Sequence, residues 1–198
     1  KPSGEAGGMA EMTYGSFNEV RLRGVLDLPQ AGIFSAKVSG QYRKRDGLIE
    51  LTAPDGRGRN RTDSIDSGSF MVQLRAEIAD NVTADYTYDY SKSNQTPPFS
   101  QLLRVNRNRD PRDIFDPGSP SYAFGGAFFP LDTVANPDRI TSAAIDAPVY
   151  ERSRSYGHAL TLTVGLGDAE LKSITAYRDL AWADGLDLDG SPFPVAFT

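Results

Sequence analysis

Apolar and polar residues alternate along several stretches of this chain with a period of two. Between Phe70 and Ile78, apolar residues take every second position, and Gln73, Arg75 and Glu77 stand between them. A two-residue period directs these two sets of side chains to opposite faces of a β-strand. Similar alternation recurs in four further stretches, residues 20–28, 34–42, 82–90 and 156–166. The pattern therefore predicts strands with one apolar face and one polar face.

Turn signals join these strands into hairpins. Tight turns are expected at three places, Pro29 to Gly32, Asp80-Asn81 and Gly167-Asp168. A short first strand, residues 8–14, meets the second strand at Gly15-Ser16. A last strand, residues 170–182, mixes apolar and polar residues in both parities, so the pattern does not assign its faces. The sequence thus predicts an all-β protein of about seven antiparallel strands in up-and-down order.

The two ends of the predicted hairpins differ. The tight turns lie at one end, whereas the connections at the other end include two long loops, residues 43–69 and 91–153. Aromatic residues gather toward the end with the long loops: Tyr14, Phe17, Tyr42, Phe70, Tyr88, Tyr90, Tyr156 and Trp182. Outer-membrane barrels combine short periplasmic turns, long extracellular loops and aromatic girdles at the membrane interfaces. Since a soluble sandwich gives no reason for this sorting, a segment of a transmembrane β-barrel is expected.

The composition is compatible with such a segment without requiring it. Of the 198 residues, 39% are hydrophobic, which would also suffice for one or two soluble domains. A mean hydropathy of -0.42 and the lack of a long apolar run argue against a transmembrane helix. The net charge of -5 argues against a nucleic-acid binder. The sequence contains no cysteine, which excludes disulfides, thiolate metal sites and cysteine nucleophiles.

Several short motifs carry a family resemblance. The segments Lys1 to Gly8, Tyr14 to Asn18 and Arg23-Gly24-Val25 resemble the plug-to-barrel junction and first barrel hairpin of TonB-dependent outer-membrane receptors. The segments Arg43 to Gly47 and Leu171 to Arg178 are similar to strand-end and strand motifs of the same family. The resemblance implies a barrel of about twenty-two strands around an N-terminal plug, with an energy-coupling segment before the plug.

The chain departs from this family pattern by what it lacks. The plug, the coupling segment and roughly two-thirds of the strands are absent from residues 1–198, so an internal fragment, a partial barrel domain, is expected. On its own, this piece should form an open, curved sheet with two unpaired edges. The implied partners are outer-membrane lipid, lipopolysaccharide, a small-molecule or chelate ligand and, through the missing N-terminal region, the inner-membrane Ton complex.

The function implied by the resemblance is energy-coupled uptake of a ferric siderophore or a similarly scarce ligand, in the outer membrane of a Gram-negative bacterium. Two alternatives stay open, a passive porin-type channel and a soluble β-sandwich binding module. No enzyme activity is expected, because the sequence offers no convergent acid, base and nucleophile. Neither a cofactor nor a nucleic-acid partner is expected.

Two polar features of the sequence are candidate metal or catalytic sites. The only histidine, His158, falls on the apolar parity of its strand, so a position facing the membrane interface is favoured over a ligand or catalytic role. The cluster Asp184, Asp187 and Asp189 beside Gly190 has the look of half a calcium loop but lacks the distal glutamate. A solvated acidic loop is therefore favoured over a cation site.

The second long loop holds the candidate ligand-binding residues, which are Arg104, Arg107, Arg109, Arg112, Tyr122 and Phe124. Arginine forks bind carboxylates, phosphates or anionic chelates, and aromatic rings stack on chelating groups. The alternative is a structural role, in which the same arginines contact lipopolysaccharide phosphates or pair with loop aspartates such as Asp110. The sequence is compatible with both interpretations.

Overall fold

The structure is a computed structural model that describes residues 1–53, 58–104, 131–194 and 198. Strands dominate these residues, which contain no α-helix and a single short 3-10 turn, η1 (Leu131–Thr133). No helix in the described part of the chain is long and apolar enough to cross a membrane. The all-β class expected from the alternation is confirmed.

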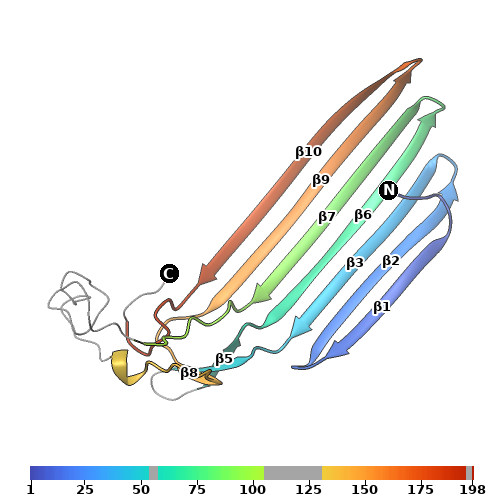
Figure 1. The fold of residues 1–198 in the computed structure, drawn as a ribbon. Helices are drawn as coiled ribbons and strands as arrows, with labels where there is room; N and C mark the ends of the chain where they lie inside the picture. Colours follow the sequence, from blue (N-terminus) through green and yellow to red (C-terminus); the bar gives the residue numbers. More distant parts are fainter. Residues whose placement is uncertain (54–57, 105–130, 195–197) are drawn as a thin grey trace. The chain divides into compact units, whose positions relative to one another are not determined.

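Seven long strands lie side by side in one sheet (Figure 1). In spatial order they are β1 (Gly7–Gly15), β2 (Glu19–Ala31), β3 (Phe34–Arg45), β6 (Ile65–Ala79), β7 (Val82–Gln95), β9 (Tyr150–Leu166) and β10 (Ala169–Gly185). The sheet is antiparallel and not closed, so β1 and β10 are its edges. The open seven-strand sheet predicted from the sequence is therefore confirmed.

Backbone geometry explains the turns between these strands. Gly32 in the β2–β3 turn and Gly167 in the β9–β10 turn have φ of 62° and 72°. This left-handed region favours glycine, because glycine has no Cβ to clash with the backbone. In the β1–β2 connection the same region is occupied by Phe17 and Asn18, with φ of 61° and 53°. The tight β6–β7 turn falls at residues 80–81, where the sequence placed it.

Cross-strand register sorts the side chains onto two faces. Leu74 of β6 lies opposite Tyr86 of β7, and the next residue, Arg75, lies opposite Asp85. Residues directly opposite each other in an antiparallel pair share a face. Leu74 and Arg75 therefore lie on different faces, as predicted. We call the face that bears Leu74 and Tyr86 the apolar face and the face that bears Arg75 and Asp85 the polar face.

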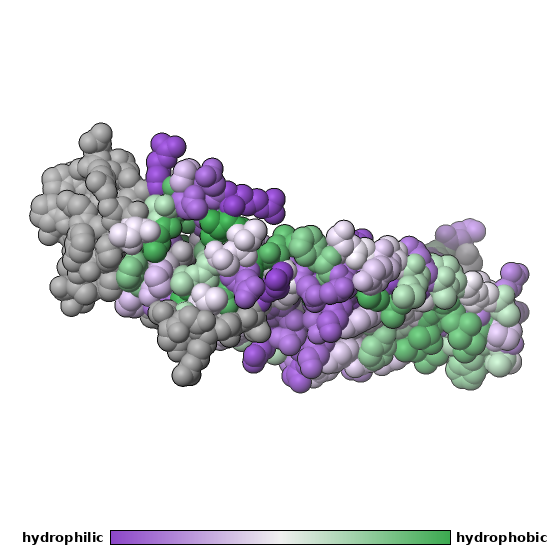
Figure 2. Space-filling view, turned by 90° about the horizontal axis from the view of Figure 1, so that it is seen from below, coloured by the Kyte–Doolittle hydropathy of each residue, from purple (hydrophilic) through white to green (hydrophobic). Residues whose placement is uncertain are grey.

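Most of the apolar face is not covered by any described residue. Its large side chains stay exposed along several strands, with 52% of Leu26, 42% of Leu74 and 60% of Leu166 accessible. Figure 2 shows hydrophobic side chains gathered toward the tight-hairpin end of the sheet, beside a hydrophilic area. Because no buried apolar core is found in the seven strands, packing between described residues does not account for the stability of this sheet.

Contact clustering divides the chain into two compact units, one of residues 1–45, 66–94 and 152–182 and one of residues 46–65, 95–151 and 183–198. The second unit contains a three-stranded sheet in the order β5 (Gly58–Thr62), β4 (Ile49–Thr52), β8 (Ser142–Ala144). Strand β4 runs antiparallel to β5 and parallel to β8. The buried apolar side chains of the described residues all belong to this unit: Leu51, Leu131, Ile145 and Ala147.

The described parts of the two predicted long loops contain regular structure. The flanking strands extend into them, with ends at Arg45, Ile65, Gln95 and Tyr150, and the loops themselves contain β4, β5 and β8. Buried polar groups explain part of this order. The Ser64 amide donates to Thr96 Oγ1 at 3.0 Å, and the Thr96 amide donates to Ser64 Oγ at 3.2 Å. Such pairing requires two segments that are distant in sequence, so alternation within one segment could not predict it.

Candidate functional site

The polar face of the sheet is organised by charge pairs between strands. Arg75 binds Asp85 through two parallel hydrogen bonds, Nε to Oδ1 at 2.7 Å and Nη2 to Oδ2 at 3.0 Å. Lys1 Nζ also donates to Asp85 Oδ2, at 2.6 Å. The Asp85 side chain is only 11% exposed, so the carboxylate depends on these donors. Arg75 and Asp85, which the β6–β7 register places opposite each other, thus form one bidentate pair.

The segment before β1 crosses this face. The Ser3 amide donates to both carboxylate oxygens of Asp27 on β2, at 3.1 and 3.2 Å, and Lys37 Nζ lies 3.4 Å from Asp27 Oδ2. The Gln30 amide donates to the Gly4 carbonyl at 2.8 Å, and Gly4 has φ of 79°. Residues 1–4 are therefore held against the polar face from β2 to β7 by polar contacts.

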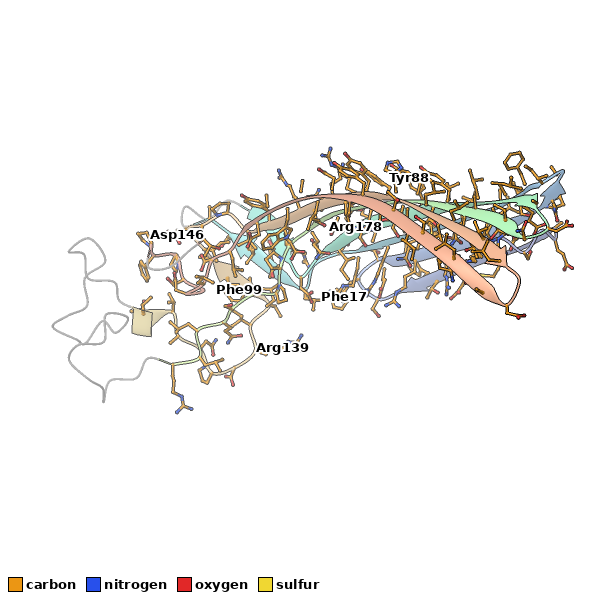
Figure 3. The ribbon with its side chains drawn as sticks, turned by 90° about the horizontal axis from the view of Figure 1, so that it is seen from above. Phe17, Tyr88, Phe99, Arg139, Asp146 and Arg178 are labelled. Atoms are coloured by element: carbon orange, nitrogen blue, oxygen red, sulfur yellow. The ribbon has the colours of Figure 1, made fainter. Side chains whose placement is uncertain are left out.

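A third charge pair assigns the faces of β10, which the sequence pattern left open. Arg178 of β10 reaches across β9 to Asp89 of β7, with Nη2 to Oδ1 at 2.7 Å and Nη1 to Oδ2 at 3.0 Å. The path leads over Gly157 of β9, where a Cβ would lie 3.0 Å from Arg178 Nη2. In Figure 3, Arg178 and Tyr88 project from opposite sides of the curved sheet. Arg178 therefore belongs to the polar face, and a glycine at position 157 leaves it room.

Arginines and serines line a hollow of about 540 Å³ on the polar face, toward the end away from the tight hairpins. Arg21 of β2 and Arg43 of β3 lie directly opposite each other. Each donates through Nε to Glu19 Oε1, at 2.6 and 2.8 Å. Other residues that line the hollow are Arg23, Lys92, Ser69, Ser91 and Ser93. Two neighbouring guanidinium groups repel each other, so the Glu19 carboxylate stabilises the pair.

Aromatic rings cluster on the apolar face around His158. Tyr86 Oη and His158 Nδ1 are 2.7 Å apart, and the Tyr88 and His158 ring centroids are 4.9 Å apart. Phe70 and Tyr156 extend the cluster, with centroids 5.8 Å from Tyr88 and 6.2 Å from His158. His158 thus lies among tyrosines on the apolar parity, as the sequence placed it. A wet hydroxyl beside an apolar ring is the chemistry that suits a membrane interface.

Among the other described aromatic side chains, Tyr14 and Tyr42 follow the predicted sorting, whereas Phe34 does not. Tyr14 and Tyr42 lie near the strand ends away from the tight hairpins, at 68% and 37% exposure. Phe34, which is 58% exposed, lies at the tight-hairpin end, where the sequence argument placed no aromatic residue. Barrels carry aromatic girdles at both interfaces, so a ring at this end fits the same architecture.

Of the candidate ligand-binding residues in the second long loop, only Arg104 lies within the described part of the chain. Arg104 is described and exposed. The other five candidates, Arg107, Arg109, Arg112, Tyr122 and Phe124, lie outside the described residues. The candidate ligand site in the long loop therefore stays a prediction.

The acidic cluster differs from the solvated loop that was expected. Asp187 is 1% exposed, and its Oδ1 accepts the Gly190 amide at 2.7 Å while Oδ2 has no hydrogen-bond partner among described groups. Burial, together with the charges of Asp189 and Asp146, raises the pKa of Asp187 from 3.8 to about 6. The expectation of a solvated cluster is wrong for Asp187, because the chain folds this carboxylate into the second unit.

Sequence reasoning missed the arginine hollow. Arg21 and Arg23 alternate with Val20 and Leu22 in the sequence, which predicts the polar face for both, but their relation to Arg43 depends on the β2–β3 register. The β2–β3 hairpin contains a bulge between Leu28 and Ala31, which shifts this register. The alternation predicts that Arg21 lies on the polar face, but its position opposite Arg43 depends on the geometry of the β2–β3 turn.

Described residues contain no group of three or more histidine, aspartate or glutamate side chains arranged to hold a metal ion. Comparison with models of known protein families gives no match, and no curated protein matches the chain. The two faces of the sheet are therefore the features that bear on function.

Proposed function

We propose that this chain forms part of the membrane-spanning barrel of an energy-coupled outer-membrane receptor, which imports a scarce ligand such as a ferric siderophore. One observation carries most of the argument. The apolar face keeps large side chains such as Leu26 and Leu166 more than half exposed, at 52% and 60%, while the opposite face carries charge pairs. In water such an extended apolar face is unfavourable, whereas hydrocarbon matches it.

Two further features support the proposal. The cluster of Tyr86, Tyr88, Tyr156 and His158 on the apolar face has the composition of an interfacial girdle. Residues 1–4 cross the polar face, as expected if this segment resembles the junction between an interior plug and the first barrel strand. Outer-membrane lipid, lipopolysaccharide and the Ton complex are the partners that follow from this proposal.

Fractionation of the native cells tests the location. The protein is expected in the outer-membrane fraction, and unheated samples should migrate faster in detergent gels than heated samples, because closed barrels resist unfolding by detergent. Recovery in the soluble fraction, with no effect of heating on mobility, would favour the β-sandwich binding module. In that module the apolar face would be buried against a second sheet.

Uptake measurements test energy coupling separately. Cells with and without the gene are supplied with radiolabelled ferric siderophores, before and after the proton gradient is collapsed. Gene-dependent uptake that stops with the gradient supports the receptor. Gene-dependent uptake that continues without the gradient would favour the passive porin. Uptake that is the same in both strains would contradict a role in siderophore import.

A further inference from the structure

The arginine hollow has more hydrogen-bond donors than its own acceptors use. Arg21 and Arg43 share the single oxygen Glu19 Oε1, and each uses only Nε in its hydrogen bonds to described residues. Their side chains are 53% and 40% exposed. A guanidinium carries five N–H donors in a planar fork, so most of the donors of both groups stay available.

Arg23 adds a third guanidinium on the same face. It lies opposite Glu11 on one side and Gln41 on the other, yet it makes no hydrogen bond or ion pair with any described residue. Lys92 also borders the hollow. Lys92 lies opposite Gly68, however, and so has the parity of the apolar face. On the polar face, three guanidinium groups thus meet two carboxylates, those of Glu11 and Glu19, in a chain whose net charge is -5.

Hydroxyl groups complete the lining. Ser67 lies opposite Ser93, and Ser69 lies opposite Ser91, so four serines stand in two adjacent cross-strand pairs. Ser93 Oγ is buried and has no hydrogen-bond partner among described groups. Small side chains leave a space of about 540 Å³, which lies within the range of small-molecule sites, roughly 300 to 1,000 Å³. Hydroxyl donors beside arginine forks are suited to oxygen anions.

We infer that this hollow binds a small ligand with at least two oxyanion groups, carboxylate or phosphate. Arg23 and the free donors of Arg21 and Arg43 hold the anions, and the serine hydroxyls bind the remaining oxygens. Glu19 keeps the two opposed guanidinium groups together when the ligand is absent. This inference rests on the proposed function, because the polar face would line the interior of the barrel, and it names an anionic substrate class for that receptor.

Calorimetric titration of the full native protein in detergent micelles tests the inference. The probes are pyrophosphate and tricarballylate, which separate phosphate from carboxylate recognition, and the neutral triamide of tricarballylate serves as the uncharged control. At least one anion should bind, more weakly at high salt, because the arginines are partly exposed. The triamide should not bind.

Arg23→Gln is the decisive variant, since Arg23 has no ion pair to break in the described protein. We expect it to weaken anion binding by about tenfold, the usual scale of a charge-assisted hydrogen bond. Arg23→Lys keeps the charge without the fork and should give a smaller loss. Arg178→Gln removes the same charge from the same face, outside the residues that line the hollow, and should change affinity by less than about twofold.

Three results would overturn the inference: no binding of either anion, equal binding by Arg23→Gln and the native protein, or an equal loss in Arg178→Gln. The hollow could instead be occupied by an acidic segment of the same protein. In that case neither anion would bind, and Arg23→Gln would lower the unfolding temperature. If the protein is found in the outer membrane but binds neither anion, the inferred anion site is wrong and the proposed function still stands. If the protein binds an anion but is recovered in the soluble fraction, the proposed function is wrong and the inferred anion site still stands.

Discussion

Replacement of Leu74 by arginine tests which face of the sheet meets hydrocarbon. Leu74 lies five residues before Ala79, the last residue of β6. At about 3.4 Å per residue this distance is about 17 Å along the strand, and a tilt of about 40° reduces it to about 13 Å along the membrane normal. The apolar band of a barrel is about 25 Å tall, so Leu74 should lie near its middle. There, arginine should cost about 2 to 4 kcal/mol.

The matched control is Gln73→Arg, which places the same side chain one residue away on the polar face, opposite Thr87. We expect this change to cost less than about 1 kcal/mol, because the polar face is hydrated. Reversible urea unfolding of the protein from lipid vesicles gives both free energies of unfolding. Equal losses for the two variants would mean that Leu74 does not face lipid, and the membrane orientation of the sheet would fail with it.

Three further predictions concern single contacts. Because the pKa of Asp187 is raised from 3.8 to about 6, its contribution to stability is fully present below about pH 4 and is lost as the pH rises through 6. The measurement is the protection of the Gly190 amide from hydrogen exchange as a function of pH, and Asp187→Asn should remove the pH dependence of this protection. The same pH profile in the variant and the native protein would contradict the prediction. Gly157→Val should separate Arg178 from Asp89 and cost about 1 kcal/mol, but less in the Arg178→Gln background; equal costs in both backgrounds would refute the crossing. Tyr86→Phe and His158→Phe should couple by about 1 kcal/mol in a double-mutant cycle of unfolding; purely additive effects would exclude a stabilising hydrogen bond.

The sequence by itself determined the strands and most of their faces. Side chains alternate strictly along a strand, so the separation of Leu74 from Arg75 follows from their neighbouring positions. The turns at Asp80-Asn81 and Gly167-Asp168 were also predictable, because turn preferences are local. These elements predicted the antiparallel up-and-down order without any knowledge of tertiary contacts, whereas the two open edges were expected from the family resemblance.

Tertiary structure alone decided how distant residues meet. The pair Arg178 and Asp89 is separated by 89 residues in sequence and depends on the space above Gly157. The opposition of Arg21 and Arg43 depends on the register of their hairpin, and the burial of Asp187 depends on packing in the second unit. Periodicity reports only the direction of a side chain from its own strand. The partner of that side chain is set by register and by the closure of long connections, and neither leaves a local signal in the sequence.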